Sequence, residues 1–281
     1  METKKEVIRA EVLGFCMGVR AAMKKVDKAA AEAEKRDKVY TFGPLIHNSQ
    51  VLDDLAFRGV GQIDDPEEID EGTVVVRAHG IEKKIYNQLV DRGLNVIDGT
   101  CPRVLRSMKT VDKYSRKGWH VILFGDAEHG EIRALAGYAD KVTIVENPAQ
   151  AMNLEVPKQS MVIAQTTVSP TAYEEVCRIL LAKNPDLHVI RSICPATQKR
   201  QQALRDLSVK VQAIVVIGGR HSSNTKRLFE LAQSSGKPSW HIEVADELPE
   251  ALSRYTRIGI TAGASTPDWI IDEVENRIME M

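Results

Sequence analysis

Two kinds of hydrophobic pattern alternate along this chain. Uninterrupted apolar and β-branched runs such as VYTF, TVVV, HVILF and AIVVI are typical of strands buried on both faces of a parallel sheet. Between them lie longer stretches, such as MGVRAAMKKVDKAAAEAEK, in which apolar residues recur at helical spacing. The alternation of the two patterns predicts an α/β fold.

The pattern occurs three times, each time around a cysteine. Cys16 follows VIRAEVLGF, Cys101 follows LNVIDGT and Cys194 follows LHVIRSI, and a helix-like stretch comes after each of them. Pro102 and Pro195 directly follow the second and third cysteines, and proline is favoured at the first position of a helix. We therefore expect each cysteine at the C-terminal end of a strand, where open α/β sheets bind their ligands.

Two polar loops follow each cysteine at matching distances. The first loop comes 31, 28 and about 28 residues after the cysteine, and the second comes 63, 65 and 71 residues after it. The first loops contain His47 and Asn48; His129, Gly130 and Glu131; and His221, Ser222, Ser223 and Asn224. The second loops contain His79; Gln165, Thr166 and Thr167; and Ser265. Polar loops also end the strands of unrelated α/β proteins, so the matched spacing carries the argument for a repeat.

The repeat predicts three small α/β subdomains, 17–100, 101–193 and 194–281. The third lacks a last strand, and the N-terminal segment 1–16 has a strand without a repeat of its own. We expect this segment to complete the third subdomain. The three cysteines would then face a common centre in a trefoil with pseudo-three-fold symmetry.

Composition and charge exclude several classes of protein. The 281 residues are 43% hydrophobic and 27% charged with a formal net charge of −1, so no overall field favours nucleic acid or an anionic membrane. No apolar run approaches the roughly 18 residues that span a bilayer, and the N-terminus lacks the apolar core of a secretory signal. We therefore expect a cytoplasmic protein.

Three convergent cysteines indicate a metal centre with an open position. The paired C-x-x-C spacing of structural zinc and the tight cysteine run of four-cysteine ferredoxins are both absent. Three thiolates could hold one [4Fe–4S] cluster and leave its fourth iron open to substrate. Cys177 lies in the apolar helical stretch TAYEEVCRILLAKN, and we expect it in the core.

The polar loops suit an anionic ligand, although simpler interpretations remain open. Hydroxyl and backbone N–H groups at helix starts bind phosphate, but Ser222, Ser223, Asn224 and Ser265 are equally suited to plain N-capping. Glu131 could deliver a proton to a leaving hydroxyl, or could simply favour the dipole of the helix that it begins. His120, His188 and His241 lie away from the loops, and we expect structural roles for them.

These motifs together resemble the LytB family. The resemblance rests on GFCMGV, GPLIHN, RAHGI, DGTCP, EHGE, AQTTVS, ICPAT, SSNT and TAGASTPDW, in that order along almost the whole chain. It implies an oxygen-sensitive [4Fe–4S] reductase of the methylerythritol phosphate pathway. Such an enzyme reductively dehydroxylates (E)-4-hydroxy-3-methylbut-2-enyl diphosphate to isopentenyl and dimethylallyl diphosphates. Reduced ferredoxin or flavodoxin supplies the electrons.

The resemblance also implies residue roles. Cys16, Cys101 and Cys194 would bind the cluster, Glu131 would donate or relay a proton, and Thr166 would orient the substrate hydroxyl. The residues implied in diphosphate binding are His47, His79, His129, Ser222, Ser223, Asn224 and Ser265, with His129 also at the catalytic end. The sequence departs from the family pattern at Gly130, where proline is frequent, at His221 and at Pro195.

Two other classes of function remain as rivals. A non-enzymatic iron–sulfur sensor or electron carrier would need the cysteines but not the polar loops. A hydrolase with one Cys–His pair would leave two of the three matching cysteines without a use.

Overall fold

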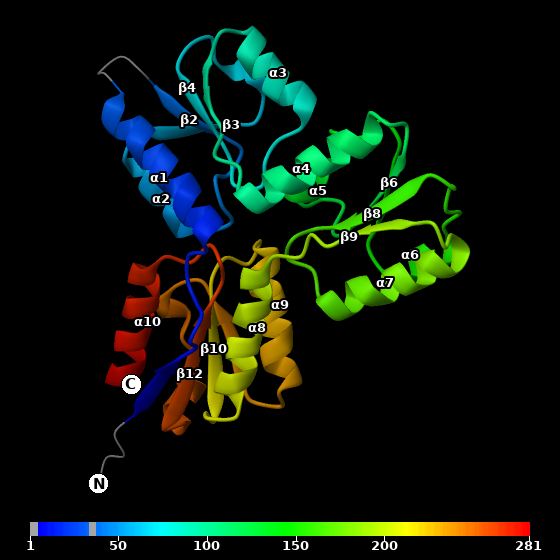
Figure 1. Ribbon diagram of the computed structural model, residues 1–281. Helices are drawn as coiled ribbons and strands as arrows, with labels where there is room; N and C mark the ends of the chain where they lie inside the picture. Colours follow the sequence, from blue (N-terminus) through cyan, green and yellow to red (C-terminus); the bar gives the residue numbers. More distant parts are fainter. Residues whose placement is uncertain (1–4, 34–37) are drawn as a thin grey trace. The chain divides into compact units, whose positions relative to one another are not determined.

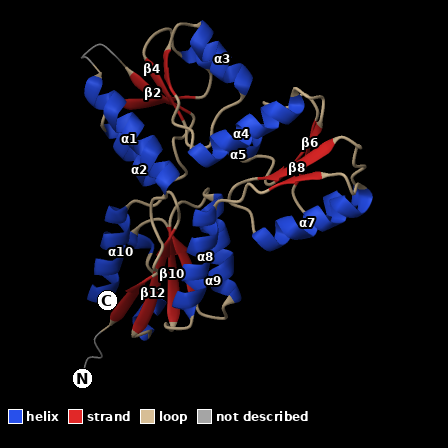
Figure 2. Ribbon diagram, viewed as in Figure 1, coloured by secondary structure: helices blue, strands red, loops and turns tan. Residues whose placement is uncertain are grey.

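In the part of the chain that the structure describes, all the paired strands run parallel and form three sheets of four strands each. The computed structural model describes residues 5–33 and 38–281 (Figures 1 and 2). The predicted α/β class is confirmed. The arrangement of the three parts around a common centre stays a prediction, as do the subdomain limits 17–100, 101–193 and 194–281 with 1–16.

The first sheet has the strand order β3-β2-β4-β5. Its strands are β2 (Val39–Phe42), β3 (Val60–Ile63), β4 (Thr73–Val76) and β5 (Asn95–Ile97), and the helices of this stretch are α1 (Met17–Glu32), α2 (Ser49–Phe57), the 3-10 helix η1 (Pro66–Glu68) and α3 (Lys83–Asp91).

The second sheet has the order β7-β6-β8-β9. Its strands are β6 (His120–Phe124), β7 (Val142–Val145), β8 (Ser160–Ala164) and β9 (His188–Ile190), and the helices are α4 (Pro102–Ser115), α5 (Gly130–Ala136), α6 (Pro148–Asn153) and α7 (Pro170–Lys183).

The third sheet has the order β1-β12-β10-β11. Its strands are β1 (Glu6–Arg9), β10 (Ala213–Ile217), β11 (Ser239–Ile242) and β12 (Arg257–Ala262), and the helices are α8 (Pro195–Ser208), α9 (Ser223–Ser234), η2 (Ala245–Glu247), η3 (Glu250–Arg254) and α10 (Asp268–Glu280).

The three sheets share one topology. Within each repeat the second strand pairs with the first, the first with the third, and the third with an edge strand. In the third sheet this edge strand is β1, which pairs in parallel with β12 although the two are about 250 residues apart in the chain. The edge strands β5, β9 and β1 are the ones that lead to Cys101, Cys194 and Cys16.

Helices cover both faces of the second and third sheets. In the third sheet Val215 and Ile260 pack with helix α10, whereas Ile214 and Val216 pack with helices α8 and α9. In the second sheet helices α4 and α5 cover one face, and helices α6 and α7 cover the other. This double burial explains the uninterrupted apolar runs, because successive side chains on a strand point to opposite faces.

The chain divides into two compact units. Unit 1 comprises Met1–Val19, Ile46–Asp54 and Pro195–Met281, and unit 2 comprises Arg20–Leu45 and Leu55–Cys194. Unit 1 therefore contains the third sheet, and unit 2 contains the first and second. Among the helices that the structure describes, none has the length and apolar character needed to cross a membrane.

Candidate active site

Each of the three repeat cysteines lies directly before a helix. Cys16 precedes α1, Cys101 precedes α4 and Cys194 precedes α8. Pro102 and Pro195 begin their helices, as predicted, and the proline after the third cysteine thus has a structural use. Each of the three cysteines therefore lies at the positive end of a helix, which favours bound negative charge.

An equivalent backbone hydrogen bond anchors all three cysteines. In each repeat the cysteine N–H donates to the second residue after the neighbouring strand, which is β12, β4 or β8. The three pairs are Cys16 to Ala264 at 3.1 Å, Cys101 to Ala78 at 3.0 Å and Cys194 to Thr166 at 2.9 Å. The residue after the acceptor is therefore Ser265, His79 or Thr167, so the second polar loops begin at matching places in the fold.

The fourth cysteine differs in its environment. Cys16, Cys101 and Cys194 have partly exposed side chains, whereas Cys177 is 8% exposed inside helix α7. Burial raises the pKa of the Cys177 thiol to about 11, so this residue is protonated at neutral pH. The prediction of a core position for Cys177 is confirmed.

Glu131 is a buried acid at the start of helix α5. It is 1% exposed, and both of its carboxylate oxygens accept hydrogen bonds from Thr166. The Thr166 backbone N–H donates to Oε1 at 2.7 Å, and the Thr166 hydroxyl donates to Oε2 at 2.8 Å. Since Thr166 also accepts the Cys194 bond, one residue joins the buried acid to a candidate cluster ligand.

Desolvation raises the pKa of Glu131 to about 7, and the two Thr166 bonds oppose that rise. An ordinary first-turn glutamate would be exposed and ionised. Glu131 does lie in the first turn, but its burial leaves it partly protonated at neutral pH. The geometry therefore favours the proton-donor interpretation over the purely electrostatic one.

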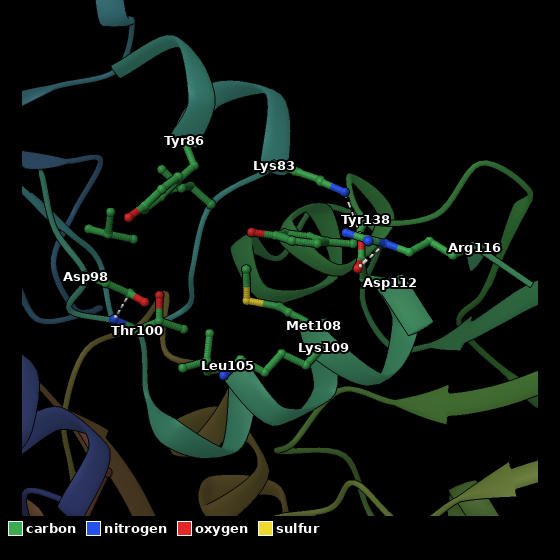
Figure 3. A pocket seen from close by; sticks show the side chains of 12 residues that line it. Lys83, Tyr86, Asp98, Thr100, Leu105, Met108, Lys109, Asp112, Arg116 and Tyr138 are labelled. Carbon is green, nitrogen blue, oxygen red and sulfur yellow. Dashed lines mark hydrogen bonds and ion pairs between the residues drawn. The ribbon is translucent and has the colours of Figure 1, made fainter. Parts of the chain in front are cut away.

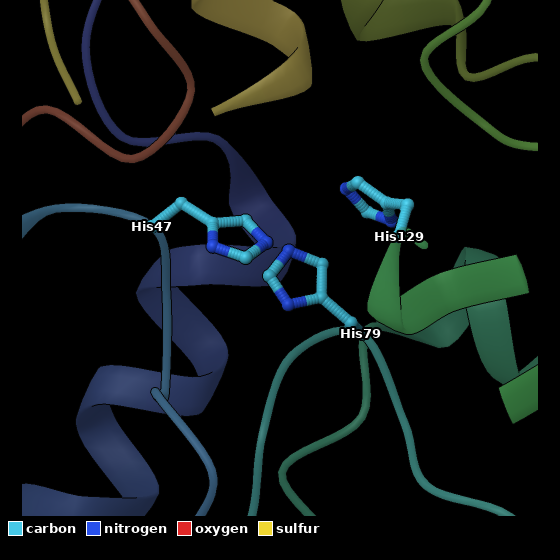
Figure 4. A group of neighbouring side chains, drawn as sticks. All are labelled: His47, His79 and His129. Atoms are coloured by element: carbon cyan, nitrogen blue, oxygen red, sulfur yellow. The ribbon is translucent and has the colours of Figure 1, made fainter. Parts of the chain in front are cut away.

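Two candidate histidines of unit 2 contact each other. The His79 and His129 rings meet edge to face with their centroids 5.1 Å apart (Figure 4). His129 caps helix α5, because its Nδ1 accepts the Glu131 backbone N–H at 3.1 Å. A ring whose Nδ1 is an acceptor carries its proton on Nε2, which can then donate to an anion.

His79 lies in a turn and not at a helix start. The helix that follows begins only at Lys83, with Glu82 as its N-cap residue. His79 instead belongs to the turn that the Gly80 N–H closes on the Arg77 carbonyl at 3.0 Å. A turn and an extended residue, Glu82, thus separate His79 from the helix that follows it.

The serine-rich loop of unit 1 has one capping residue. Ser222 is the N-cap of helix α9 and accepts the Thr225 N–H at 3.3 Å. Ser223 and Asn224 are the first two helical residues, so neither is the N-cap. Asn224 is 6% exposed, and its side-chain Nδ2 has no hydrogen-bond partner within the described chain. A buried amide donor without a partner is costly, and a bound anion would satisfy it.

The remaining candidates of unit 1 lie around the same loop. The Ser265 hydroxyl donates to the His47 carbonyl at 3.1 Å, and helix α10 begins only at Asp268, so Ser265 is not the N-cap of that helix. A Cβ added to Gly219 would lie 2.3 Å from the same carbonyl. Neighbouring Asn48 is 2% exposed, and its Nδ2 also lacks a partner in the part of the chain that is described.

The structure thus collects the predicted residues in two groups. Unit 1 holds Cys16, His47, Ser222, Ser223, Asn224 and Ser265, and unit 2 holds Cys101, Cys194, His79, His129, Glu131 and Thr166. His120 and His188 begin strands and His241 lies within one, as expected, and His221 is exposed. The catalytic and binding roles of these residues stay predictions.

Unit 2 also contains a cavity that sequence reasoning missed. It has a volume of about 260 Å³, and apolar side chains such as Leu105 and Met108 are among those that line it (Figure 3). The Lys83–Asp112 ion pair, at 2.7 Å, lies at its rim, and Thr100, the residue before Cys101, lines its wall. None of the predicted site residues lines this cavity.

The cysteine positions fit an iron–sulfur cluster. All three are free of disulfides and partly exposed, and each is held by its backbone in the same way between an edge strand and a helix start. Their side chains are partly exposed and therefore accessible to a metal, in contrast with the buried Cys177. The donor set suits iron better than a hard cation, because thiolates are soft ligands.

The fold and the site together indicate an α/β protein whose three repeat cysteines suit an iron–sulfur cluster and whose Glu131 is a buried acid. Comparison with known proteins gives the family, since the family model described as LytB protein matches residues 7–279. The chain therefore belongs to the LytB family, whose members are iron–sulfur enzymes.

Individual relatives align with this chain over almost their full length. A Treponema denticola protein named 4-hydroxy-3-methylbut-2-enyl diphosphate reductase is 45% identical and covers 98% of this chain and 99% of its own. A Geobacter sulfurreducens protein of the same name is 39% identical over 98% of this chain and 97% of its own.

Two solved structures have the same fold. One is (E)-4-hydroxy-3-methyl-but-2-enyl diphosphate reductase, the terminal enzyme of the non-mevalonate pathway. It is 37% identical with a TM-score of 0.72, over 99% of this chain and all of that one. The other is the E-1-hydroxy-2-methyl-but-2-enyl-4-diphosphate reductase from Plasmodium falciparum. It is 27% identical with a TM-score of 0.90, over 97% of this chain and 87% of that one.

Proposed function

We propose that this chain is the terminal reductase of the methylerythritol phosphate route to isoprenoids. The reaction converts (E)-4-hydroxy-3-methylbut-2-enyl diphosphate to isopentenyl or dimethylallyl diphosphate. The substrate takes up two electrons and two protons, its allylic C–O bond breaks, and the hydroxyl group leaves as water.

The observation that carries this proposal is the buried Glu131 carboxyl. A leaving hydroxide is poor, so the hydroxyl group must receive a proton as its C–O bond breaks. Glu131 has a pKa of about 7 and can supply that proton at neutral pH. The Thr166 hydroxyl, 2.8 Å from Oε2, keeps the carboxyl group oriented. A mere electron carrier has no use for such an acid.

Cys16, Cys101 and Cys194 are the residues that would hold the cofactor, a [4Fe–4S] cluster with its fourth iron open. When bound, the cluster supplies electrons to the substrate and Lewis acidity towards its oxygen. The chain's own part is to hold the three thiolates at helix starts and to keep Cys177 protonated and out of the site.

The diphosphate would be bound by neutral donors and histidines. His129 offers its Nε2–H because its Nδ1 is occupied, and His79 lies against it. In unit 1 the unsatisfied Asn224 amide and the start of helix α9 are suited to phosphate oxygens, with Ser222, Ser223, Ser265 and His47 beside them. This role also accounts for a buried donor that the protein leaves unpaired.

Several finer points belong to the same proposal. The electrons would come from a small reduced protein, a ferredoxin or a flavodoxin, and the enzyme would work in the cytoplasm. The three repeats would act as subdomains 17–100, 101–193 and 194–281 with 1–16. They would enclose one cluster in a trefoil.

The test is a single-turnover reaction under anaerobic conditions. Dithionite-reduced protein is mixed with the allylic diphosphate, and the products are separated and quantified. The proposal predicts both isomeric diphosphates and one water lost per two electrons consumed. Protein with an intact cluster that consumes no substrate would contradict it and would favour an electron carrier.

A further inference from the structure

Arg77 is a partly buried cation in unit 2 that none of the predicted roles includes. Its side chain approaches Gly43 and Gly80 of the first sheet's loops and Gly130 of the second sheet's. Desolvation by burial lowers the pKa of Arg77, and the nearby charge of Arg133 is the next cause. A guanidinium nevertheless remains charged at working pH. Within residues 5–33 and 38–281 it has no carboxylate within ion-pair distance.

The first loop that Arg77 holds is the turn that carries His79. The Arg77 Nε donates to the Gly80 carbonyl at 3.1 Å, and the Gly80 N–H donates back to the Arg77 carbonyl at 3.0 Å. Gly80 has a φ of +77°, a conformation that other residues rarely adopt. The Arg77 side chain and the Arg77 backbone thus both stabilise the turn that carries His79.

The second contact is with the start of helix α5, directly after His129. A Cβ added to Gly130 would lie 3.2 Å from both Cζ and Nη2 of Arg77, so the guanidinium lies against this glycine. The Arg77 guanidinium also approaches Gly43, which directly follows strand β2. A Cβ added to Gly43 would lie 2.7 Å from Nη1 of Arg77. The absence of a side chain at Gly130 leaves the room that the guanidinium occupies.

We propose that Arg77 is a positioning residue for the His79–His129 pair. It ties the His79 turn to the helix that His129 caps and so fixes the edge-to-face contact of the two rings (Figure 4). It also places a permanent positive charge beside both histidine loops, where it attracts an anionic ligand. This inference rests on the proposed function, in which the pair binds the diphosphate.

The experiment is a binding and kinetic comparison of anaerobic holoenzymes, with inorganic pyrophosphate and the allylic diphosphate as probes. Arg77→Gln is expected to weaken pyrophosphate binding and to raise KM about tenfold, equivalent to 1.4 kcal/mol. The kcat should change much less, because Glu131 and Thr166 are untouched. Arg77→Lys should recover part of the loss, since it keeps the charge but not the planar fork. Arg133→Gln is the matched control, because it removes an exposed, ion-paired cation from helix α5, the helix that His129 caps.

Gly130→Ala separates positioning from stability. Alanine is a better helix former than glycine and the φ of Gly130 is not positive, so the helix backbone accepts the change and only the contact with Arg77 opposes it. Its added methyl group should displace the guanidinium and weaken pyrophosphate binding. In the Arg77→Gln background the same change should have no further effect on binding, and this non-additivity is the signature of contact.

The outcomes are distinct. Weaker binding in Arg77→Gln with a non-additive double variant supports the inference. Wild-type affinity and KM in Arg77→Gln, or fully additive effects, overturn it while leaving the proposed function intact. Failure of the wild-type holoenzyme to bind either probe overturns the proposed function and this inference with it.

Discussion

The Thr166 hydroxyl donates to Glu131 Oε2 at 2.8 Å while the Thr166 carbonyl accepts the Cys194 N–H at 2.9 Å. A single residue of the loop after strand β8 thereby links the buried acid to a cysteine expected to hold iron. Proton delivery and electron delivery would thus meet at one short segment of unit 2. The pH behaviour of the enzyme should report on this link.

Activity should fall as the pH rises through about 7. The proton-donating form of Glu131 is protonated, and its pKa is raised to about 7 by burial. We expect kcat to decline by about tenfold per pH unit above that value. Anaerobic assays between pH 5.5 and 9 measure this decline of kcat.

Glu131→Gln should lose most turnover while it keeps its cluster and its affinity for the substrate. A variant with near-normal turnover would remove Glu131 from the proton path.

Stability should respond to pH in the same direction. The folded pKa of Glu131 lies above its ordinary value of 4.5, so its favourable contribution is fully present below pH 4.5 and is lost as the pH rises through about 7. Relative to Glu131→Gln, wild type should lose about 3 kcal/mol between these limits. Melting temperatures of both proteins at pH 5 and pH 8 test this. An unchanged difference between the two would show that the acid is not desolvated.

Thr166→Val should shift the alkaline decline of kcat to higher pH. The Thr166 hydroxyl bond lowers the pKa of Glu131, so its removal should raise that pKa further. Thr166→Ser keeps the donor and is the matched control, with its decline expected at the wild-type pH. A decline that stays in place in the valine variant would mean that the hydroxyl does not bond the acid in solution.

The cysteines should separate into two classes. Cys16→Ser, Cys101→Ser and Cys194→Ser should each lose cluster iron, because each removes one thiolate. Cys177→Ser should retain the full cluster, since Cys177 is buried within helix α7 and its thiol is protonated at neutral pH. Iron content and visible spectra of anaerobic preparations measure this. A stable native cluster in Cys101→Ser would refute the three-ligand scheme.

Ser222 and Asn224 should differ in what they do. Ser222→Ala removes the N-cap of helix α9 and should destabilise the protein by about 1 kcal/mol. Asn224→Ala removes a buried donor without a partner, so stability should be maintained while pyrophosphate affinity falls about tenfold.

Asn147→Ala is the control for this pair. It removes an equivalent cap, which bonds the Gln150 N–H at 3.0 Å on helix α6, and should cost stability without a change in binding. Equal pyrophosphate affinity in wild type and Asn224→Ala would exclude Asn224 from the anion site.

The strands and the cysteine positions could be predicted because parallel strands buried on both faces have distinctive apolar runs. Pro102 and Pro195 likewise predicted the starts of helices α4 and α8 correctly. The exact starts of helices α3 and α10, at Lys83 and Asp268, could not be predicted, because the turns before them carry no strong signal in the sequence.

Other features depend on tertiary contacts that no local pattern encodes. The bond from Thr166 to Glu131 joins residues 35 positions apart, and the raised pKa follows from burial among distant segments. Arg77 stands beside His79 in RAHGI, but nothing in that motif indicates its contact with Gly130. The unsatisfied amide of Asn224 is likewise visible only when all neighbours are known.

The most direct measurement is made on anaerobically purified protein. Iron and sulfide are quantified, and the spectrum of the cluster is recorded with and without the allylic diphosphate. The account predicts about four irons per chain and a spectral change on substrate addition, because three cysteines leave one iron open. The account would be contradicted by a cluster whose spectrum does not change when the substrate is added. It would also be contradicted by a protein that holds no cluster under strictly anaerobic conditions.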